Sequence, residues 1–311
     1  MTTRTGVLLV DVPCAVCGSS DGQPILKAGD NEHDLVGSFT VVQCANCGHT
    51  FTNPRPTIDS IPALYPDTYS AFATNTRHTR MARAKSRYAH FVQFGTQPVR
   101  RRGRMLEVGC GAGANLRRHR ELGLEVIGIE PSVGAAATAS ADGLDVIVGT
   151  DERVAELEPG TFDVVHALMV VEHVPDPRRT LRRLFDATAP GGALAVSTPN
   201  FDCRSRRLFG SHWFPLQLPR HFHHFDADRL CSLLVDAGWV IDRVWYQPTL
   251  TDTGKSLRLA SIDRGRPLPE RAVKLGFNLI DIVAFPIILA MAKSRGATRM
   301  TIHAHKPASP T

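Results

Sequence analysis

The chain has 311 residues, of which 43% are hydrophobic and 21% are charged. This composition excludes disordered and collagen-like chains, and the length suits one α/β core with an appendage better than one minimal domain. The formal net charge of +6 would suit an acidic partner such as a phosphate, a nucleotide sugar, an anionic lipid or a nucleic acid, but solubility alone also explains it.

The first residues argue against a secretory signal. An apolar stretch of four residues, 7–10, is followed at once by Asp11, which is too short for a signal core. Four of the seven cysteines lie within residues 14–47, and this crowding favours a metal site in a reducing compartment over a disulfide framework. We therefore expect a cytoplasmic protein.

Two Cys-x-x-Cys pairs, Cys14 with Cys17 and Cys44 with Cys47, are separated by 26 residues. A glycine follows each second cysteine, as is typical of zinc-ribbon knuckles. Four thiolates form a closed tetrahedral site, so a bound Zn²⁺ would be structural and not catalytic. The long interval would be filled by a hairpin or a loop at small entropic cost. We expect residues 1–56 to form a zinc-ribbon-like module.

Three alternatives to this interpretation remain. The thiols would be unligated, or His33 and His49 would substitute as ligands, or the ribbon would bind nucleic acid. The last gives a function of another class, a zinc-ribbon RNA- or DNA-binding protein or a nucleic-acid methyltransferase. Between Asp11 and Asn53 there are one lysine, no arginine and five acidic residues, a poor electrostatic match to phosphates.

Residues 57–98 are predicted to be helical connectors. The sequence Tyr65-Pro66-Asp67 would interrupt them, and residues 81–94 form an amphipathic stretch.

From Arg104 the pattern changes to apolar runs separated by helical stretches. Regular β/α alternation predicts an α/β fold in which helices cover both faces of a mostly parallel sheet. Residues 99–311 would form this domain, interrupted by an apolar insertion at 246–297. The predicted strands are Met105–Val108, Val126–Ile129, Val146–Val148, Phe162–Leu168, Leu194–Thr198, Val240–Trp245 and Met300–His305.

The first of these strands leads into a glycine-rich turn, residues 109–113, and then into a helix from Asn115. Glycine lets the backbone approach a ligand closely. The next strand ends at Glu130, about twenty residues later, a spacing that places a carboxylate for ribose hydroxyls. A dinucleotide-dependent oxidoreductase is the rival interpretation, but its pyrophosphate loop has the spacing Gly-x-Gly-x-x-Gly, which differs from that seen here.

Five segments together resemble the motifs of class I S-adenosylmethionine-dependent methyltransferases. They are Glu107–Gly113, Gly128–Ser132, Phe162–Val165, Val171–Pro177 and Ala189–Gly192. The resemblance covers most of the chain and implies a Rossmann-like seven-stranded sheet and S-adenosylmethionine as cofactor. The cofactor-binding residues that it implies are Glu107, Gly109, Gly111, Gly113, Glu130, Thr150 and Asp151.

Each of these positions carries an expected role. The three glycines would line the methionine moiety and Glu130 would hold the ribose. Thr150 and Asp151 would lie near the adenine, with Glu152 as the alternative for the acidic position.

The acceptor is expected beyond the carboxyl ends of the strands. Histidine is the natural general base there, because its pKa lies near neutrality, and His173 and His221 are the catalytic candidates. Alternatively, His221, His223 and His224 cap the helix that begins near Asp226, and methyl transfer needs only alignment of donor and acceptor in a dry site.

A four-cysteine module before a class I domain resembles the deoxysugar C-methyltransferases. Those enzymes carry Glu-His where this chain has Arg220-His221, which weakens the case for enolate chemistry, and Arg220 would suit an acceptor phosphate or carboxylate. The acceptor would be a small molecule such as a sugar, a lipid-linked sugar or a secondary metabolite. Methylation at oxygen, nitrogen or carbon stays open, as does the oligomeric state.

Residues 275–292 are the most apolar run in the chain. Asp281 and Pro286 in its middle would be costly in hydrocarbon, and its length is borderline for a membrane span. A buried or lid helix and a peripheral membrane contact are the main alternatives. A membrane contact would imply a lipid-linked or hydrophobic acceptor and a membrane-associated protein.

Overall fold

The computed structural model describes residues 3–4, 7–31, 35, 37–65, 88–95, 102–292 and 296–308. The chain divides into two compact units. The first unit comprises Met1–Leu64, Pro199–Arg229 and Trp245–Met300, and the second comprises Tyr65–Thr198, Leu230–Val244 and Thr301–Thr311. The domain boundaries expected after residues 56 and 98 stay predictions.

A seven-stranded sheet, with strand order β13-β14-β11-β10-β7-β8-β9, forms the core of the second unit. Strands β9, β8, β7, β10 and β11 pair in parallel, as expected for strands joined by helical crossovers. All seven predicted strands are confirmed. Their bounds are Arg104–Val108 (β7), Glu125–Glu130 (β8), Asp145–Val148 (β9), Phe162–Leu168 (β10), Thr188–Pro199 (β11), Val240–Tyr246 (β13) and Arg299–His305 (β14).

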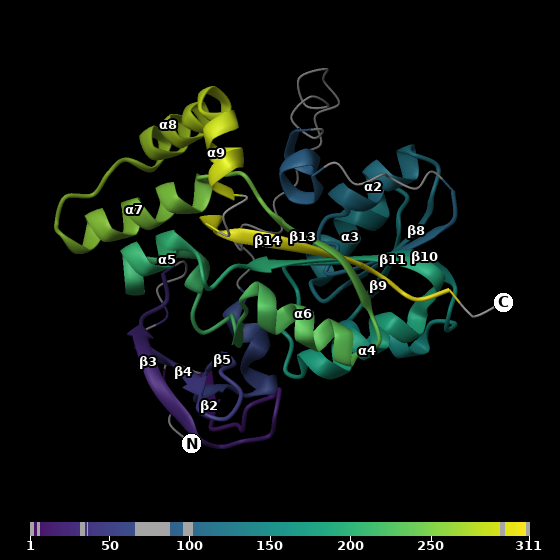
Figure 1. Ribbon diagram of the computed structural model, residues 1–311, viewed down its shortest axis with the longest axis horizontal. Helices are drawn as coiled ribbons and strands as arrows, with labels where there is room; N and C mark the ends of the chain where they lie inside the picture. Colours follow the sequence, from purple (N-terminus) through teal and green to yellow (C-terminus); the bar gives the residue numbers. More distant parts are fainter. Residues whose placement is uncertain are drawn as a thin grey trace. The chain divides into compact units, whose positions relative to one another are not determined.

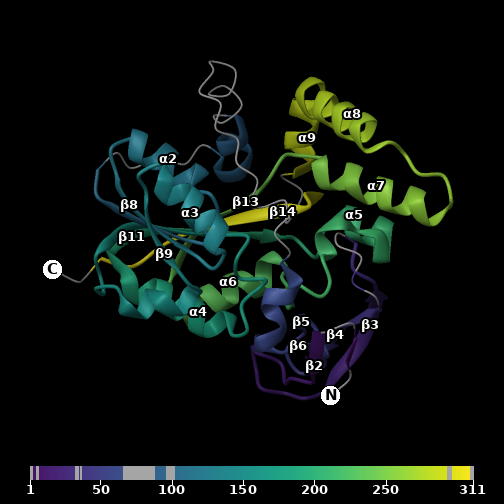
Figure 2. The ribbon, with the colours of Figure 1, turned by 180° about the vertical axis from the view of Figure 1, so that it is seen from behind.

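Helices cover both faces of this sheet, so the fold is Rossmann-like, as predicted. Helices α2 (Ala114–Glu121) and α3 (Val133–Ala141) lie on one face, and α4 (Pro177–Ala187) and α6 (Ala227–Asp236) lie on the other (Figures 1 and 2). On the first face Met105, Leu116 and Leu144 belong to one buried cluster. Burial of the central strands on both faces explains their continuous apolar sequences.

Two small sheets build the N-terminal part of the first unit. Strands β1 (Thr3–Arg4), β2 (Val7–Val10) and β6 (Arg55–Pro56) form one, and strands β12 (His223–His224), β5 (Thr50–Thr52), β4 (Phe39–Cys44) and β3 (Gly22–Ala28) form the other, in that order. The hairpin expected between the cysteine pairs is the antiparallel pair β3 and β4. Strand β12 comes from a segment about 170 residues further along the chain and pairs with β5.

Helices and turns occupy the rest of the first unit. They are η1 (Ile58–Leu64), α5 (Arg204–Phe209), η4 (Gly210–His212), η5 (Phe214–Leu216), α7 (Thr251–Asp263), α8 (Glu270–Val283) and α9 (Phe285–Met291). In the second unit, residues 88–94 are helical. The remaining residues of the predicted connectors, 66–87 and 96–98, lie outside the described residues, as does most of the predicted interruption at 65–67.

The apolar run at residues 275–292 forms two helices because Pro286 lies in the first turn of α9. Asp281 is buried and accepts hydrogen bonds from the Thr249 hydroxyl (2.7 Å) and the Leu250 N–H (2.8 Å). Leu275 and Val283 are 72% and 74% exposed, so this side of α8 does not belong to the core. None of the described helices is long and apolar enough to cross a membrane.

Candidate functional site

The two Cys-x-x-Cys segments fold into turns with the same hydrogen bonds. The Cys14 carbonyl accepts from the Gly18 N–H (2.8 Å), and the Cys44 carbonyl accepts from the Gly48 N–H, also at 2.8 Å. Gly18 and Gly48 have φ of +76° and +73°, a region that side chains disfavour. This is why a glycine follows each second cysteine.

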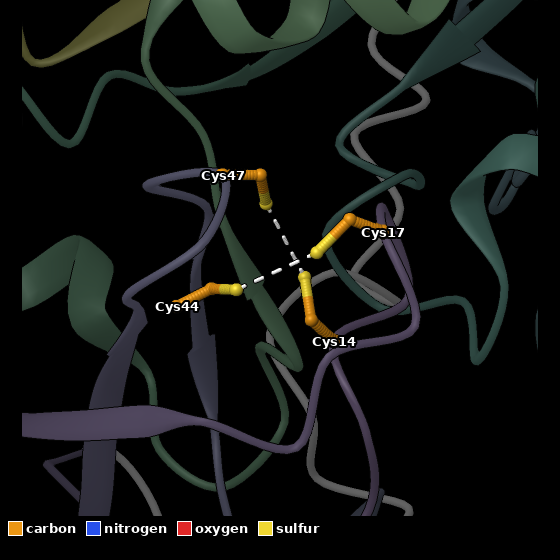
Figure 3. A group of neighbouring side chains, drawn as sticks. All are labelled: Cys14, Cys17, Cys44 and Cys47. Carbon is orange, nitrogen blue, oxygen red and sulfur yellow. Dashed lines mark hydrogen bonds between the residues drawn. The ribbon is translucent and has the colours of Figure 1, made fainter.

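The four sulfur atoms converge (Figure 3). The Sγ atoms of Cys14 and Cys47 are 3.6 Å apart, those of Cys17 and Cys44 are 3.5 Å apart, and all four lie within 4.8 Å of one another. A tetrahedral Zn²⁺ with Zn–S bonds of about 2.3 Å would hold its sulfurs about 3.8 Å apart, whereas a disulfide needs about 2.05 Å. The donor set and its spacing therefore fit Zn²⁺.

The surroundings of these sulfurs favour the thiolate form at Cys17. The backbone N–H of Ser19 is the main group that lowers the pKa of Cys17, to about 6, whereas burial raises the pKa of Cys14 to about 12. His49 lies beside the second turn, but its ring stacks on Phe51 and its Nε2 is 3.0 Å from Nδ1 of His223. The structure gives His49 a packing role, and His33 lies outside the described residues.

In the second unit, the glycine-rich turn between β7 and α2 uses positive φ at each of its three glycines: Gly109 (+71°), Gly111 (+55°) and Gly113 (+77°). A Cβ on Gly109 would lie 2.5 Å from Cγ2 of Val170, and one on Gly113 would lie 2.3 Å from Cδ1 of Leu144. Conformation therefore favours glycine at all three positions, and crowding adds to this at Gly109 and Gly113. The turn forms a cradle at the carboxyl end of β7.

Glu130 closes this cradle from the end of β8. Its Oε2 accepts the Gly111 N–H (2.7 Å) and its Oε1 accepts the Ser132 N–H (2.8 Å). Only 4% of Glu130 is exposed, and burial raises the pKa of its carboxyl despite these two donors. A carboxylate has about four acceptor positions, so two remain for ligand hydroxyls.

Glu107 lies beside the same turn and is 3% exposed. Asn115 donates one amide hydrogen to its Oε1 (2.9 Å) and lies 3.0 Å from Nδ1 of His166. The other oxygen, Oε2, is buried without a hydrogen-bond partner, and burial raises the pKa of the carboxyl to about 8. A buried carboxyl with one unsatisfied oxygen is suited to a cationic or hydrogen-bond-donating ligand group.

Thr150 and Asp151 follow β9, next to Glu130, whose carbonyl accepts the Gly149 N–H (3.0 Å). The Thr150 hydroxyl caps η3 (Asp151–Glu156). Asp151 is buried and accepts from the Thr180 hydroxyl (2.8 Å) and Arg183 Nη1 (2.7 Å) on α4. Both side chains therefore stabilise η3, and a contact with adenine stays a prediction.

His173 follows β10, and its Nδ1 is 3.0 Å from the Tyr65 hydroxyl. Glu172 beside it is fully buried. Three residues upstream of Glu172, Met169 has φ of +59°, a conformation that non-glycine residues adopt at few positions outside functional or tight turns. No sequence signal reveals such a conformation, so sequence reasoning missed Met169, as it missed Asn115.

His221 lies in the first unit, in the turn between η5 and β12. Its ring Nδ1 is 2.9 Å from the Pro215 carbonyl. A carbonyl oxygen only accepts, so Nδ1 carries the proton, and in the neutral ring the lone pair resides on Nε2. The nitrogen that would act as a base is thus defined by the geometry.

The neighbours of His221 do not have the roles expected of them. His223 and His224 form β12 and are buried, and the side chain that caps α6 is Asp226, which accepts the Arg229 N–H (2.7 Å). Arg220 is fully buried in an ion pair with Asp30. It therefore does not face solvent to receive an acceptor phosphate.

A family model described as a methyltransferase domain matches residues 77–244, which is more than half of the chain. The ubiquinone biosynthesis O-methyltransferase of Bradyrhizobium sp. (strain ORS 278) is 35% identical over 158 residues, covering 47% of this chain and 62% of that protein. The enzyme of the same name from Pseudomonas paraeruginosa is 34% identical, over 39% of this chain and 56% of that protein. The chain thus matches little more than half the length of these relatives.

Solved structures show the same fold at low identity. Phosphoethanolamine N-methyltransferase 2 of Haemonchus contortus, solved with S-adenosyl-L-methionine, matches with a TM-score of 0.50 and 19% identity, over 83% of this chain and 63% of that chain. A chain from the complex of the Haloferax volcanii Trm112 methyltransferase activator with a putative methyltransferase also has a TM-score of 0.50, at 15% identity, over 73% of this chain and 95% of that chain. The glycine cradle, the seven-stranded sheet and the family match agree, and the chain belongs to the methyltransferase domain family.

Proposed function

We propose that this protein transfers a methyl group from S-adenosylmethionine to a small-molecule acceptor. The observation that carries the proposal is the cradle at the carboxyl ends of β7 and β8, where three glycines with positive φ lie between two buried carboxyl groups, Glu107 and Glu130. S-adenosylmethionine carries an ammonium and a sulfonium, and cations are favoured beside carboxylates. Its bound methyl group supplies the electrophile.

The cradle supports a separate role for each cofactor-binding residue. Glu130 would accept the ribose hydroxyls with the acceptor positions that its two backbone donors leave. Glu107 would receive the ammonium group through its unsatisfied Oε2, while Gly109, Gly111 and Gly113 allow the methionine moiety close to the backbone. Thr150 and Asp151 would lie at the adenine end, where their bonds within η3 and to α4 keep that turn rigid.

We propose that Cys14, Cys17, Cys44 and Cys47 bind one structural Zn²⁺. Four thiolates leave no open coordination position for water or substrate. The metal would hold the two turns of the module together and take no part in the chemistry.

The acceptor would be a sugar, a lipid-linked sugar or another secondary metabolite, in keeping with the module arrangement of deoxysugar C-methyltransferases. His221 would take the acceptor proton at Nε2, because its Nδ1–H is committed to the Pro215 carbonyl. His173, held by the Tyr65 hydroxyl, would orient the acceptor or share the acid–base role. The buried ion pair of Arg220 with Asp30 removes one argument for a phosphorylated acceptor.

The exposed apolar side of α8 and α9 supports a peripheral membrane contact through residues 275–292. Leu275, Leu279, Val283 and Ile287 are between 59% and 74% exposed, and basic side chains precede them at Arg271 and Lys274. This pattern is typical of helices that lie in the interface of an anionic membrane. It would bring the protein to a lipid-linked acceptor.

A labelled-donor assay tests the proposed function. The protein is incubated with methyl-labelled S-adenosylmethionine and, in parallel, with polar metabolite, lipid and RNA extracts. We expect label in the metabolite or lipid fraction, dependent on Glu130. Label confined to RNA would overturn the small-molecule assignment, and the absence of transfer together with the absence of cofactor binding would overturn the methyltransferase assignment.

A further inference from the structure

A fully buried ion pair joins two distant segments of the first unit. Arg220 donates from Nη1 to Oδ2 of Asp30 (3.1 Å) and from Nη2 to Oδ1 (2.5 Å), and both side chains are 0% exposed. Asp30 follows β3 in the cysteine module, whereas Arg220 directly precedes His221. A buried ion pair adds little net stability, but the loss of one partner leaves an uncompensated buried charge and is costly.

The neighbour of Asp30 fixes the same turn at a second point. The Asn31 side-chain amide donates to the carbonyls of Phe214 (3.1 Å) and Trp213 (3.4 Å). Both carbonyls belong to the segment that leads to Pro215, whose own carbonyl accepts from His221. The loop after β3 thus fixes the partner of the His221 ring as well as the residue before His221.

Strand β5 fixes the backbone of His221 from the other side. The Thr52 hydroxyl donates to the His221 carbonyl (2.7 Å), and the Thr52 N–H donates to the Phe222 carbonyl (2.9 Å). Because that hydroxyl hydrogen is used, the contact of Thr52 Oγ1 with His224 Nε2 (3.1 Å) has the histidine as donor. His221 is therefore held between two elements of the cysteine module.

We propose that Asp30 and Arg220 are positioning residues that fix the tautomer and orientation of His221. The inference rests on the proposed acid–base role of His221. The ion pair holds residue 220 in place, Asn31 holds the Pro215 segment, and together they keep the Nδ1–H of His221 directed at the Pro215 carbonyl. The cysteine module then has a second role, the orientation of a base located about 170 residues away in the sequence.

Nitrogen-15 NMR of the histidine rings tests the positioning of His221 and needs no identified acceptor. Protonated and unprotonated ring nitrogens have well-separated chemical shifts. His221→Gln assigns the signals by their loss. We expect one neutral tautomer with the proton on Nδ1 in the wild type, and a mixture of tautomers in Asp30→Asn, in which Arg220 lacks its counter-charge. Asp202→Asn is the matched control, because its pair with Arg207 is about half exposed.

A second variant keeps the test decisive if Asp30→Asn does not fold. Asp30→Leu combined with Arg220→Met removes both buried charges together. A folded form of either variant that keeps the single Nδ1–H tautomer would overturn the proposal. We expect loss of that tautomer with unchanged affinity for S-adenosylhomocysteine, since the cofactor cradle lies in the second unit.

Assays of methyl transfer distinguish the positioning role of Asp30 and Arg220 from the acid–base role of His221 on which it rests. With labelled donor and metabolite extract, we expect His221→Gln and Asp30→Asn to lower turnover by a similar factor, of about tenfold or more. Unchanged turnover in His221→Gln would refute the role of His221 as a base but leave the tautomer result intact. Unchanged turnover in Asp30→Asn alone would refute the positioning role.

Discussion

The cysteine site and the glycine cradle are both built on tight turns, but they meet their ligands differently. In the cysteine site, two matched turns bring four sulfurs to a spacing that fits a tetrahedral cation. In the cradle, Glu107 and Glu130 are buried and their pKa values are raised before any ligand binds. With the proposed Zn²⁺ the first site would depend on its ligand for stability, whereas the second site would keep its buried carboxyl groups available for a bound cofactor.

Metal removal should have the largest effect on stability. It should act on the cysteine site and leave the glycine cradle intact. Structural zinc contributes about 10–16 kcal/mol in zinc-finger peptides, so chelation or Cys44→Ser should unfold the module while the second unit still binds S-adenosylhomocysteine. Metal analysis should find one Zn²⁺ per chain, and the two units should melt separately in calorimetry. The control is Cys231→Ser, a cysteine on α6. Retention of the module's melting transition after complete chelation would contradict a structural metal.

A substitution at Gly113 tests the cradle by sterics. Gly113→Ala places a Cβ 2.3 Å from Cδ1 of Leu144 at φ of +77°, and we expect destabilisation of about 2–4 kcal/mol from strain and overpacking. Gly160→Ala is the matched control, since its φ is +69° with no atom within 4 Å, and it should lose about 1–2 kcal/mol. Urea unfolding measures both variants. Equal losses would mean that crowding around the cradle is unimportant.

The buried carboxyl of Glu107 predicts a pH dependence. Its pKa in the folded protein is about 8 and its ordinary value is 4.5, so the folded state retains this proton more strongly than the unfolded state. Its contribution to stability is complete below pH 4.5 and declines as the pH rises to about 8, by at most about 1.4 kcal/mol per pH unit. Glu107→Gln should flatten this slope in denaturant titrations. An unchanged slope would show that Glu107 is not the titrating group.

The smallest effect on stability is expected on α8. Leu279→Glu changes a side chain that is 59% exposed, so the free energy of unfolding should move by less than about 0.5 kcal/mol. Association with anionic vesicles, measured by sedimentation, should nevertheless fall several-fold. Leu208→Glu, at a residue on α5 that is 77% exposed, should leave vesicle association unchanged. Equal association of all three proteins would refute the membrane contact.

Much of the second unit could be predicted from sequence because its signals are local. Each buried strand contains a short apolar run, and the glycine turn, helix α2 and Glu130 follow one another within residues 109–130. The two cysteine turns could be predicted equally well, because each is encoded by four or five consecutive residues. Their convergence needed only the hairpin of β3 and β4.

The features that sequence reasoning missed depend on long-range pairing or on backbone conformation. The addition of β12 to β5 and the ion pair of Asp30 with Arg220 join residues about 170 and 190 positions apart, and no periodicity encodes them. The positive φ of Met169 is likewise invisible in a residue name. The direction of the apolar side of α8 depends on Asp281, a buried carboxylate that hydropathy alone places in solvent.

The central claim is that the glycine cradle and Glu130 bind an adenosyl-methionine type of ligand. Calorimetric titration of S-adenosylhomocysteine into the wild type and Glu130→Ala tests it most directly. We predict one site per chain and a loss of affinity of about tenfold or more in the variant, since hydrogen bonds to a charged group contribute about 1.5–3 kcal/mol each. Equal affinity in the two proteins, or no binding to the folded wild type, would contradict it.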